Sequence, residues 1–296
     1  SYGSVVTAHP LPLRDAYLGR LGLDAEPPSV DALYRLHRAH VERVPYETLW
    51  IHLGDTWDVT PAESVTRIAT RNRGGYCFHL NGAFSELLGT LGYAVHRHVG
   101  GVHGPDGPDP GAMSNHLVLT VSDLPSHENP GGQWYVDAGL GDALHEPLPL
   151  LAGTYEQGPF RLALDETPGG VGDWHLTHDP LGMFPGMSWR SAPATMDAFA
   201  ERNRWLSTAP ESGFVKVLSA QRRDATGADA LSGLWLRRVG ADAYDSIVES
   251  RDDLVDVLRD RFGLDLEAMT HGSTEIDALW ARAQRAHVAW EEAGRP

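Results

Sequence analysis

The chain of 296 residues contains one cysteine, Cys77, whose neighbourhood favours reactivity. A thiol reacts as the thiolate, but a free thiol has a pKa near ~8.5 and is mostly protonated at neutral pH. A helix N-terminus and a neighbouring imidazolium both stabilise the anion. Gly74 and Gly75 precede the cysteine, so the chain can turn sharply and leave N–H groups facing a developing oxyanion. Cys77 is therefore a candidate nucleophile, and a buried unreactive thiol is the alternative.

A base and an orienting acid follow on two expected strands. "SNHLVLTV" carries His116 as its third residue, and "QWYVDAG" ends just past Asp137. If these strands form a hairpin about the loop 122–132, His116 lies opposite a position within about one residue of Asp137. An aspartate that accepts the second N–H of a histidine fixes its tautomer and stabilises the imidazolium. We expect these two residues to complete a triad with Cys77, although the chain has fifteen histidines and a chance pairing is the alternative.

Other motifs carry less chemistry. "HRH" places His96 and His98 on one face of a strand, and His103 follows. Because the chain has neither HExxH nor a second cysteine, we expect packed or surface histidines here and no metal site. "GGVHGPDGPDPG" lacks the GxxxxGK[ST] pattern, and its Asp106 and Asp109 would repel phosphate, so we expect a mobile loop.

Helices are expected in the first ninety residues. "SVDALYRLHRAHVERV" has Ser29 as its cap. In "TPAESVTRIATRNRGG" Thr60 caps the helix, Pro61 takes the first helical position, Glu63 completes a capping box, and the two glycines stop the helix. A third helix starts at Cys77, which puts the thiol in its first turn.

The pattern changes after Gly92. Short strands between turn-rich loops predict an antiparallel sheet or barrel over residues 93–191. Helices return over residues 192–296, with strands in "FVKVLSAQ" and "GLWLRRV" and a packed terminal helix in "STEIDALWARAQRAHVAWEEAG". The sequence therefore predicts an α+β fold with a helical domain at 1–92 and two further domains.

Composition limits the partners. A formal net charge of −16 would repel a phosphate backbone, so we expect no nucleic acid. Lys216 is the only lysine, so arginine forks or backbone N–H groups would hold any anionic ligand. No run approaches the roughly eighteen apolar residues of a membrane span, and the first twenty residues lack the pattern of a secretory signal. We expect a cytoplasmic protein without membrane contact.

The segment "RGGYCFHLN" resembles the R-G-G-x-C-x-E-x-N signature of the arylamine N-acetyltransferases. "VPYETL" at 44–49 resembles their P-F-E-N-L segment, and "NHLVLTV" and "WYVDAGLGD" resemble their histidine and aspartate segments. "RWLSTAPESGFVKVLSAQRR" resembles their S-T-x-P-x-S-x-F and A-Q-R stretch. The matches occur in order and cover residues from about 15 to 265.

The resemblance implies an N-terminal helical bundle, a central antiparallel β-barrel at 93–191 and a C-terminal α/β lid, with a cysteine-protease-like catalytic core. Cys77 would be the nucleophile, His116 the base and Asp137 the orienting acid. Acetyl would pass from acetyl-CoA, or another acyl from its acyl-CoA, to the cysteine and then to an arylamine, arylhydrazine or N-hydroxyarylamine. The acyl-CoA is a co-substrate, and no cofactor would stay bound.

The resemblance also implies residues around the triad. The substrate would contact Tyr46, Phe78, Leu140 and Phe214. Structural support near the site would come from Arg73, Gly74, Gly75, Asn81 and Glu47.

Three positions depart from the family pattern. His79 stands where the family has glutamate, Leu140 replaces the phenylalanine of V-D-V-G-F-G, and Ala209 replaces the histidine of S-T-H-P. Without that glutamate the Arg73 guanidinium needs another carboxylate, for which we expect Glu47. Leu140 removes an aromatic surface on which a flat amine could stack, which makes the acceptor the least determined part of the prediction.

Three other functions compete with acetyl transfer to a small aromatic amine. An amide synthase would use the same thioester chemistry on a polyketide chain bound to an acyl carrier protein, and it needs a larger pocket or a tunnel. A hydrolase would pass the acyl group to water rather than to an amine. A non-enzymatic binding module would keep the fold, and its thiol would resist alkylation.

Overall fold

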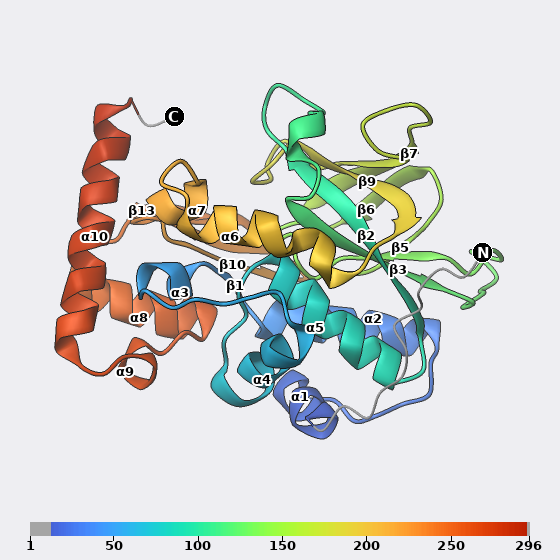
Figure 1. Ribbon diagram of the computed structural model, residues 1–296, viewed down its shortest axis with the longest axis horizontal. Helices are drawn as coiled ribbons and strands as arrows, with labels where there is room; N and C mark the ends of the chain where they lie inside the picture. The colour runs from blue at the N-terminus through green and yellow to red at the C-terminus, as the bar shows by residue number, and fades with distance from the viewer. Residues whose placement is uncertain (1–12, 295–296) are drawn as a thin grey trace.

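The structure is a computed structural model that describes residues 13–294 (Figure 1). The N-terminal part is a bundle with a short strand, β1 (Tyr46–Glu47). Its helices are α1 (Arg14–Leu21), α2 (Val30–Arg43), α3 (Leu49–His52), α4 (Pro61–Arg71) and α5 (Cys77–Thr90). Every residue of α5 except Glu86 and Thr90 is buried, so this helix forms the centre of the bundle.

The predicted helix starts are mostly correct. Ser29 caps α2 by accepting a hydrogen bond from the N–H of Ala32 at 3.0 Å, and Pro61 is the first residue of α4. The prediction for Thr60 is wrong in part, because this residue precedes α4 but its side chain makes no capping hydrogen bond. Glu63 faces outward, away from any capping box, and its carboxylate lies 3.6 Å from the guanidinium of the residue four positions along.

The predicted end of α4 is also wrong. The helix stops at Arg71, before the glycine pair, because Asn72 adopts the left-handed conformation with φ of 53°. Asparagine tolerates this conformation better than most residues. The two glycines therefore serve the turn that leads into α5 rather than the end of α4.

The central part is an antiparallel sheet that curls into a nearly closed eight-stranded barrel. Its strand order is β5-β4-β3-β2-β9-β8-β7-β6. The strands are β2 (Ala94–His103), β3 (His116–Ser122), β4 (Trp134–Val136), β5 (Leu148–Pro149), β6 (Gly153–Gln157), β7 (Phe160–Glu166), β8 (Trp174–Thr177) and β9 (Gly186–Pro193). β3 is buried along all but its last residue, because α5 packs on one side and the barrel interior lies on the other.

The C-terminal part contains a second sheet in the order β1-β10-β11-β12-β13. Its further strands are β10 (Ser219–Asp224), β11 (Gly227–Ser232), β12 (Trp235–Gly240) and β13 (Tyr244–Ile247). The helices here are α6 (Ala200–Thr208), α7 (Gly213–Lys216), α8 (Arg251–Phe262), α9 (Leu266–Met269) and α10 (Ser273–Glu292), and the 3₁₀ turn η2 (Met196–Phe199) precedes α6. The other 3₁₀ turn, η1 (Pro110–Ala112), lies between β2 and β3 in the central part. The strand expected over "FVKVLSAQ" starts only at Ser219, because α7 occupies the preceding turn.

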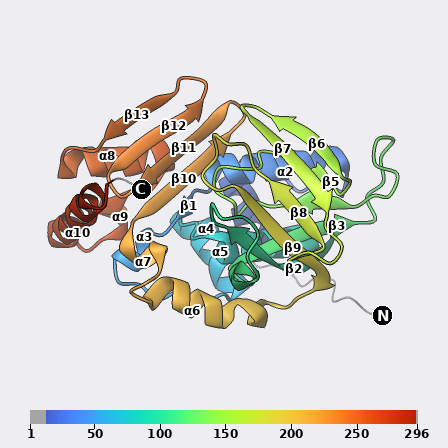
Figure 2. The ribbon, with the colours of Figure 1, turned by 90° about the horizontal axis from the view of Figure 1, so that it is seen from above.

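The three parts interlock. β1 leaves the helical bundle to pair with β10, and Leu49 packs in the same apolar cluster as β11 and α8. Seen from above, α5 lies where the two sheets meet (Figure 2). We propose residues 1–92, 93–191 and 192–296 as the three domains, with β1 as the strand that the first gives to the third.

No helix within residues 13–294 combines the length and the apolar character needed to cross a membrane. The expectation about a secretory signal concerns mainly residues 1–12, which lie outside the described part of the chain.

Candidate active site

Cys77 is the first residue of α5, and the turn before it is held tightly against β1. Gly75 has φ of 76°, a conformation that few other residues adopt, and its carbonyl accepts the N–H of Glu47 at 2.9 Å. A Cβ on Gly74 would lie 1.9 Å from the carbonyl oxygen of Pro45. The thiol itself is 4% exposed, and its Sγ lies 3.5 Å from the carbonyl oxygen of Asn115.

His116 and Asp137 lie side by side, with Nε2 of the imidazole 2.8 Å from Oδ2 of the carboxylate. Their register differs slightly from the predicted one. Leu119 pairs with Val136, and continuing that register places Asp137 opposite Val118, two residues from His116 rather than within one. Residues two apart on one strand point to the same face, so the diagonal pair still meets.

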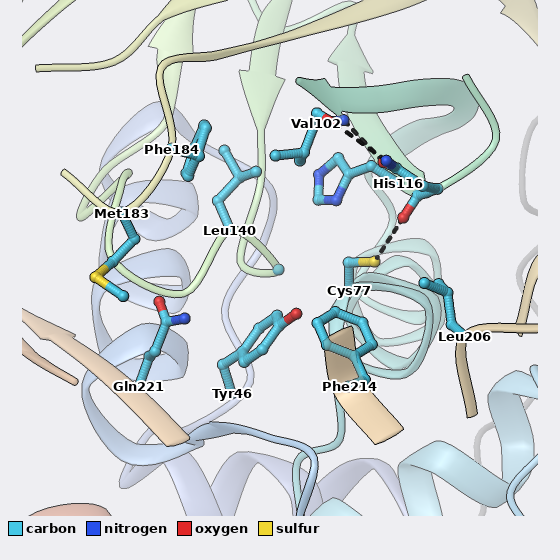
Figure 3. Close-up of a pocket in the computed structure, with 12 residues that line it drawn as sticks. Tyr46, Cys77, Val102, His116, Leu140, Met183, Phe184, Leu206, Phe214 and Gln221 are labelled. Carbon is cyan, nitrogen blue, oxygen red and sulfur yellow. Dashed lines mark hydrogen bonds between the residues drawn. The ribbon is translucent and has the colours of Figure 1, made fainter. Parts of the chain in front are cut away.

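The imidazole of His116 faces the thiol of Cys77 (Figure 3). Burial by itself lowers the pKa of His116, but the charge of Asp137, the charge of Cys77 and hydrogen bonds to both outweigh it and raise the pKa to about 10. His116 is therefore protonated at neutral pH. An imidazolium beside the sulfur stabilises negative charge there, and a thiolate is the form that attacks a thioester.

Four donors surround the carboxylate of Asp137. Besides His116 it accepts hydrogen bonds from Nδ2 of Asn81 at 2.7 Å, the hydroxyl of Tyr135 at 2.8 Å and the N–H of Gly139 at 3.1 Å. Asn81 projects from α5, so its amide ties the helix that carries the thiol to the strand end that carries the acid. Because the carboxylate is buried and accepts from four donors, its orientation is fixed.

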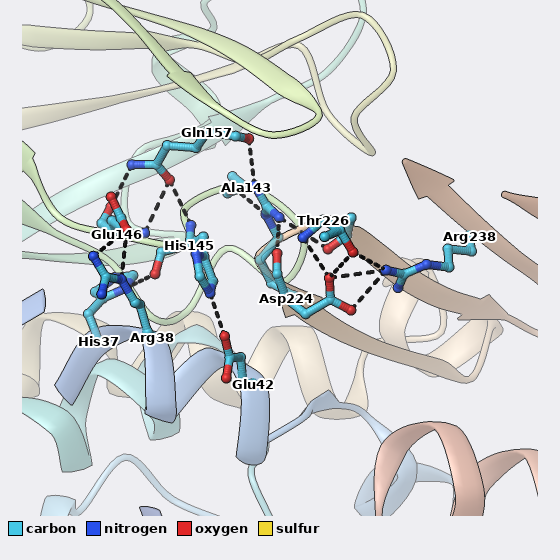
Figure 4. A network of polar contacts seen from close by, with 12 residues as sticks. His37, Arg38, Glu42, Ala143, His145, Glu146, Gln157, Asp224, Thr226 and Arg238 are labelled. Atoms are coloured by element: carbon cyan, nitrogen blue, oxygen red, sulfur yellow. Dashed lines mark hydrogen bonds and ion pairs between the residues drawn. The ribbon is translucent and has the colours of Figure 1, made fainter. Parts of the chain in front are cut away.

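A second histidine holds the backbone at Asp137. Nε2 of His37 accepts the N–H of Asp137 at 3.3 Å, and its Nδ1 donates to the carbonyl of His145 at 2.9 Å (Figure 4). Burial lowers the pKa of His37 to about 4, which keeps the ring neutral as this bonding pattern requires. The sequence pattern did not identify His37. The signal that could have found it is the pair His37 and His40, which occur among the apolar residues Leu33, Leu36 and Val41 of α2, where the structure buries both histidines.

Arg73 is paired with Glu47, the carboxylate expected for it. Its Nε lies 3.0 Å from Oε1 of the glutamate, and both side chains are buried. The ring of Trp57 stacks on the guanidinium, with its centroid 4.9 Å away. The pair joins β1 to the segment just before the glycine turn, and so braces the chain that presents Cys77.

Replacing Glu47 by glutamine is expected to destabilise the protein by about 3 kcal/mol, because Arg73 would keep a buried charge without its partner. Urea denaturation followed by circular dichroism measures this change. The control is Glu26→Gln, which breaks the half-exposed pair with Arg35 and should change the free energy of unfolding by less than about 1 kcal/mol. Equal effects of the two substitutions would contradict the bracing role of the buried pair.

His79, the departure nearest the thiol, is a structural residue in the first turn of α5. Its Nδ1 accepts the N–H of Tyr76 at 3.3 Å, and its ring packs edge-on against Trp50 and Trp57. Burial and the charge of Arg67 lower its pKa to about 3, so it is neutral. A neutral imidazole here caps the helix without adding a charge beside Cys77.

A cavity of about 290 Å³ opens beside the thiol. Three of the four residues expected to contact substrate line it, namely Tyr46, Leu140 and Phe214 (Figure 3). The cavity is also lined by Val102, Asn115, Gly139, Met183, Phe184, Leu206 and Gln221, which sequence analysis did not identify. Most of this wall is apolar, which suits a flat aromatic ligand.

The expectation for Phe78 is not met. This ring is fully buried, lies 5.1 Å from the ring of Phe199 and does not line the cavity. Successive helix residues point about 100° apart, so the residue after Cys77 faces the packed side of α5. Ala209, the third departure, follows the last residue of α6 and is not among the residues lining the cavity either.

The three histidines of the expected packed cluster are engaged by protein groups. His96 lies 3.1 Å from the hydroxyl of Ser122, His98 2.7 Å from that of Thr120, and His103 2.9 Å from that of Ser188. Within residues 13–294 no three His, Cys, Asp or Glu side chains come together in a way that could hold a metal ion.

Gly139 lies so close to Cys77 that we expect its substitution to disturb catalysis. A Cβ there would be 2.8 Å from Cα of Cys77 and 2.9 Å from Nδ2 of Asn81, so Gly139→Ala must displace the thiol. We expect the rate of Cys77 acylation to fall by about 10²-fold, the usual consequence of a misplaced reacting group. Stopped-flow measurement of the acylation burst tests this. Gly104→Ala, where no atom lies within 4 Å of the added methyl, is the control, and an unchanged burst in Gly139→Ala would contradict the prediction.

Known proteins of one family are similar to most of this chain. The family model described as N-acetyltransferase matches residues 29–271. The arylamine N-acetyltransferase of Mycolicibacterium smegmatis is 31% identical over 263 residues, which cover 84% of this chain and 91% of the relative. That of Mycobacterium tuberculosis strain H37Rv is 30% identical over 291 residues, which cover 90% and 95%.

Solved structures are similar over nearly the whole chain. The structure of Mycobacterium marinum arylamine N-acetyltransferase in complex with CoA has a TM-score of 0.79 at 26% identity, covering 92% of this chain and 98% of that one. The enzyme from Salmonella typhimurium has a TM-score of 0.78 at 26% identity, with the same coverage. These structures confirm the predicted helical, barrel and lid architecture with its cysteine-protease-like core. The chain is an enzyme of the arylamine N-acetyltransferase family.

Proposed function

We propose that this enzyme transfers an acetyl group from acetyl-CoA to a small aromatic amine through a thioester on Cys77. The observation that carries the proposal is the charged pair of His116 and Asp137 beside a buried thiol that opens into an apolar cavity. A structural thiol needs no such partners. Acyl-CoA and the amine are the partners of this reaction, and a cytoplasmic location stays part of the proposal.

In the first half of the reaction the Cys77 thiolate attacks the thioester carbonyl carbon of acetyl-CoA. A C–S bond forms, and the carbonyl π electrons move to oxygen, where first-turn N–H groups of α5 face the developing negative charge. The oxyanion then collapses, and the bond to the CoA sulfur breaks with its electron pair. His116, protonated at neutral pH, gives its proton to that sulfur, so CoA leaves as the thiol.

In the second half the amine attacks the acetyl carbon on Cys77. His116 is now neutral and takes a proton from the amine nitrogen as the new C–N bond forms. The C–S bond breaks, the thiolate returns and the imidazolium is regenerated beside it. Asp137 keeps the ring oriented through both halves, and it stays a carboxylate throughout.

The size and the lining of the cavity favour a single-ring amine over the alternatives. About 290 Å³ is at the small end of ligand pockets, which run from roughly 300 to 1,000 Å³. A macrolactam precursor on a carrier protein would need more room than this. Tyr46, Phe184 and Phe214 line the cavity with rings on which an arylamine can pack although Leu140 is aliphatic.

The proposal is tested by following acetyl-CoA with and without an arylamine such as aniline. The expected result is that added amine diverts acetyl into the amide, with little free acetate. Acetate as the main product at saturating amine would show a hydrolase instead. Acylation only by long-chain acyl-carrier thioesters would show an amide synthase. A thiol that resists iodoacetamide and is not acylated by any thioester would indicate the binding module.

A further inference from the structure

Gln221 is a polar residue in the wall of the largely apolar cavity. It lies on β10 directly opposite Tyr46 of β1, so both side chains reach the cavity from the same face of the lid sheet. The amide points between Tyr46 and Met183 into the cavity (Figure 3). Its Oε1 is buried and has no hydrogen-bond partner within residues 13–294. A buried amide oxygen without a hydrogen-bond partner is unfavourable, so this oxygen calls for an explanation.

The other side-chain amide in the wall is already used. Asn115 accepts the N–H of Val102 at 2.8 Å and donates to the Val102 carbonyl at 3.0 Å. These two bonds commit the Asn115 amide to the backbone of β2. Gln221 is therefore the amide in the wall that is free to bind a ligand.

The distance from the nucleophile to Gln221 follows from two nearby glycines. A Cβ on Gly139 would lie 2.8 Å from Cα of Cys77, and a Cβ on Gly141 would lie 2.1 Å from Oε1 of Gln221. Two residues of extended chain span at most about 7 Å. Cys77 and Gln221 therefore contact the two ends of one short segment, residues 139–141, and both line the same cavity.

We propose that Gln221 determines acceptor specificity by hydrogen bonding to a neutral polar group, a hydroxyl or a carboxamide, at the end of the aromatic amine opposite its nitrogen. The inference rests on the proposed acetyl transfer. A half turn about the terminal torsion of Gln221 exchanges its oxygen and its NH₂ group, so the amide can accept from or donate to a hydroxyl. The acetyl group carries no such substituent, so the first half of the reaction does not depend on Gln221.

The neutrality of the group follows from the charges nearby. Arg237 lies two strands from Gln221 in the same register, and its guanidinium contacts the sulfur of Met183 in the cavity wall. A cationic substituent would be repelled there. Among residues 13–294 no arginine or lysine lines the cavity to form an ion pair with a carboxylate, because Met183 lines it in place of Arg237. A hydroxyl or carboxamide is therefore the matching chemistry.

The test compares 4-aminophenol with 4-methylaniline, which differ by a hydroxyl in place of a methyl of similar size. kcat/KM for each amine is measured with saturating acetyl-CoA for the wild type and Gln221→Met. For each enzyme, the preference is kcat/KM for 4-aminophenol divided by kcat/KM for 4-methylaniline. The intrinsic difference in reactivity between the two amines is the same for both enzymes, so it cancels when their preferences are compared. We expect the preference for 4-aminophenol to fall about tenfold in Gln221→Met, the effect of losing one hydrogen bond.

Three controls separate the explanations. Gln133→Met makes the same change at an exposed position outside the cavity and should leave the preference unchanged. Tyr46→Phe removes the hydroxyl of the residue directly opposite Gln221, and it should slow both amines alike. A preference that survives in Gln221→Met, or that collapses in Tyr46→Phe instead, overturns the assignment. Acetylation of Cys77 is measured in the same samples as the turnover of both amines. If the proposed function is wrong, the acetyl-enzyme will be absent, which distinguishes that failure from a wrong assignment of Gln221.

Discussion

Replacing Cys77 by alanine is expected to reduce acetyl transfer by about 10⁵- to 10⁶-fold, because the loss of a nucleophile removes the covalent route altogether. The chain has no second cysteine to take over. His116 and Asp137 without the thiol have nothing to activate in the cavity. Amide formation from acetyl-CoA and aniline, followed by liquid chromatography, measures the change over this range.

Two measurements distinguish loss of the nucleophile from misfolding of the variant. The thermal midpoint of the Cys77→Ala variant should stay close to that of the wild type, because the substitution removes only one sulfur atom from a site that borders a cavity. Cys77→Ser keeps the size and hydrogen-bonding capacity but supplies a much less acidic nucleophile, and it should also lose most activity. A folded alanine variant with more than a few per cent of wild-type activity would rule out the thioester mechanism.

Replacing Asp137 by asparagine is expected to reduce kcat by about 10⁴-fold, the loss found when the orienting acid of a triad becomes an amide. The four donors around this carboxylate explain the size of the effect. His116, Tyr135, Asn81 and the N–H of Gly139 all point hydrogens at it, so an NH₂ group in its place must meet at least one of them. Breaking this buried network should also destabilise the fold by about 3 kcal/mol.

The pH profile distinguishes loss of charge from loss of packing. In the wild type His116 has a pKa of about 10, raised by Asp137 and Cys77 against the effect of burial. Acylation should therefore decline only as the pH rises through about 10, where the imidazolium loses its proton. Asp137→Asn removes the negative charge that favours the imidazolium, so this alkaline limit should move to lower pH.

Tyr135→Phe is the matched control for that profile. It removes one hydrogen bond to Asp137 but keeps the carboxylate charge, so it should lower kcat by about tenfold and leave the alkaline limit near pH 10. An alkaline limit that stays in place in Asp137→Asn would show that Asp137 acts through packing alone.

Local signals in the sequence were sufficient for the element that carries the thiol. The glycine pair and the apolar pattern after it predicted a helix beginning at Cys77, and α5 begins there. Where a prediction depended on the direction of one side chain it failed, as for Phe78, because adjacency in sequence does not say which face of a helix is packed. The predicted cap at Thr60 was wrong for a related reason. A residue in the capping position makes the capping hydrogen bond only if its side chain points toward the first-turn N–H groups.

Long-range placement was the part that residues alone could not supply. The predicted hairpin register placed His116 and Asp137 close together. The observed register differs from it by one residue, because β4 starts only at Trp134. That this hairpin lies over α5 came from the family resemblance. His37 and Gln221 were missed, since each meets the site only through strands or helices far away in the chain.

The central claim is that Cys77 carries the acetyl group, and intact-mass analysis after mixing with acetyl-CoA tests it most directly. We expect one added acetyl group that maps to the peptide containing Cys77 and is absent in Cys77→Ala. Addition of aniline should remove it with formation of one amide. An enzyme that forms the amide from acetyl-CoA while its mass never changes, or one that carries acetyl on another residue, would contradict it.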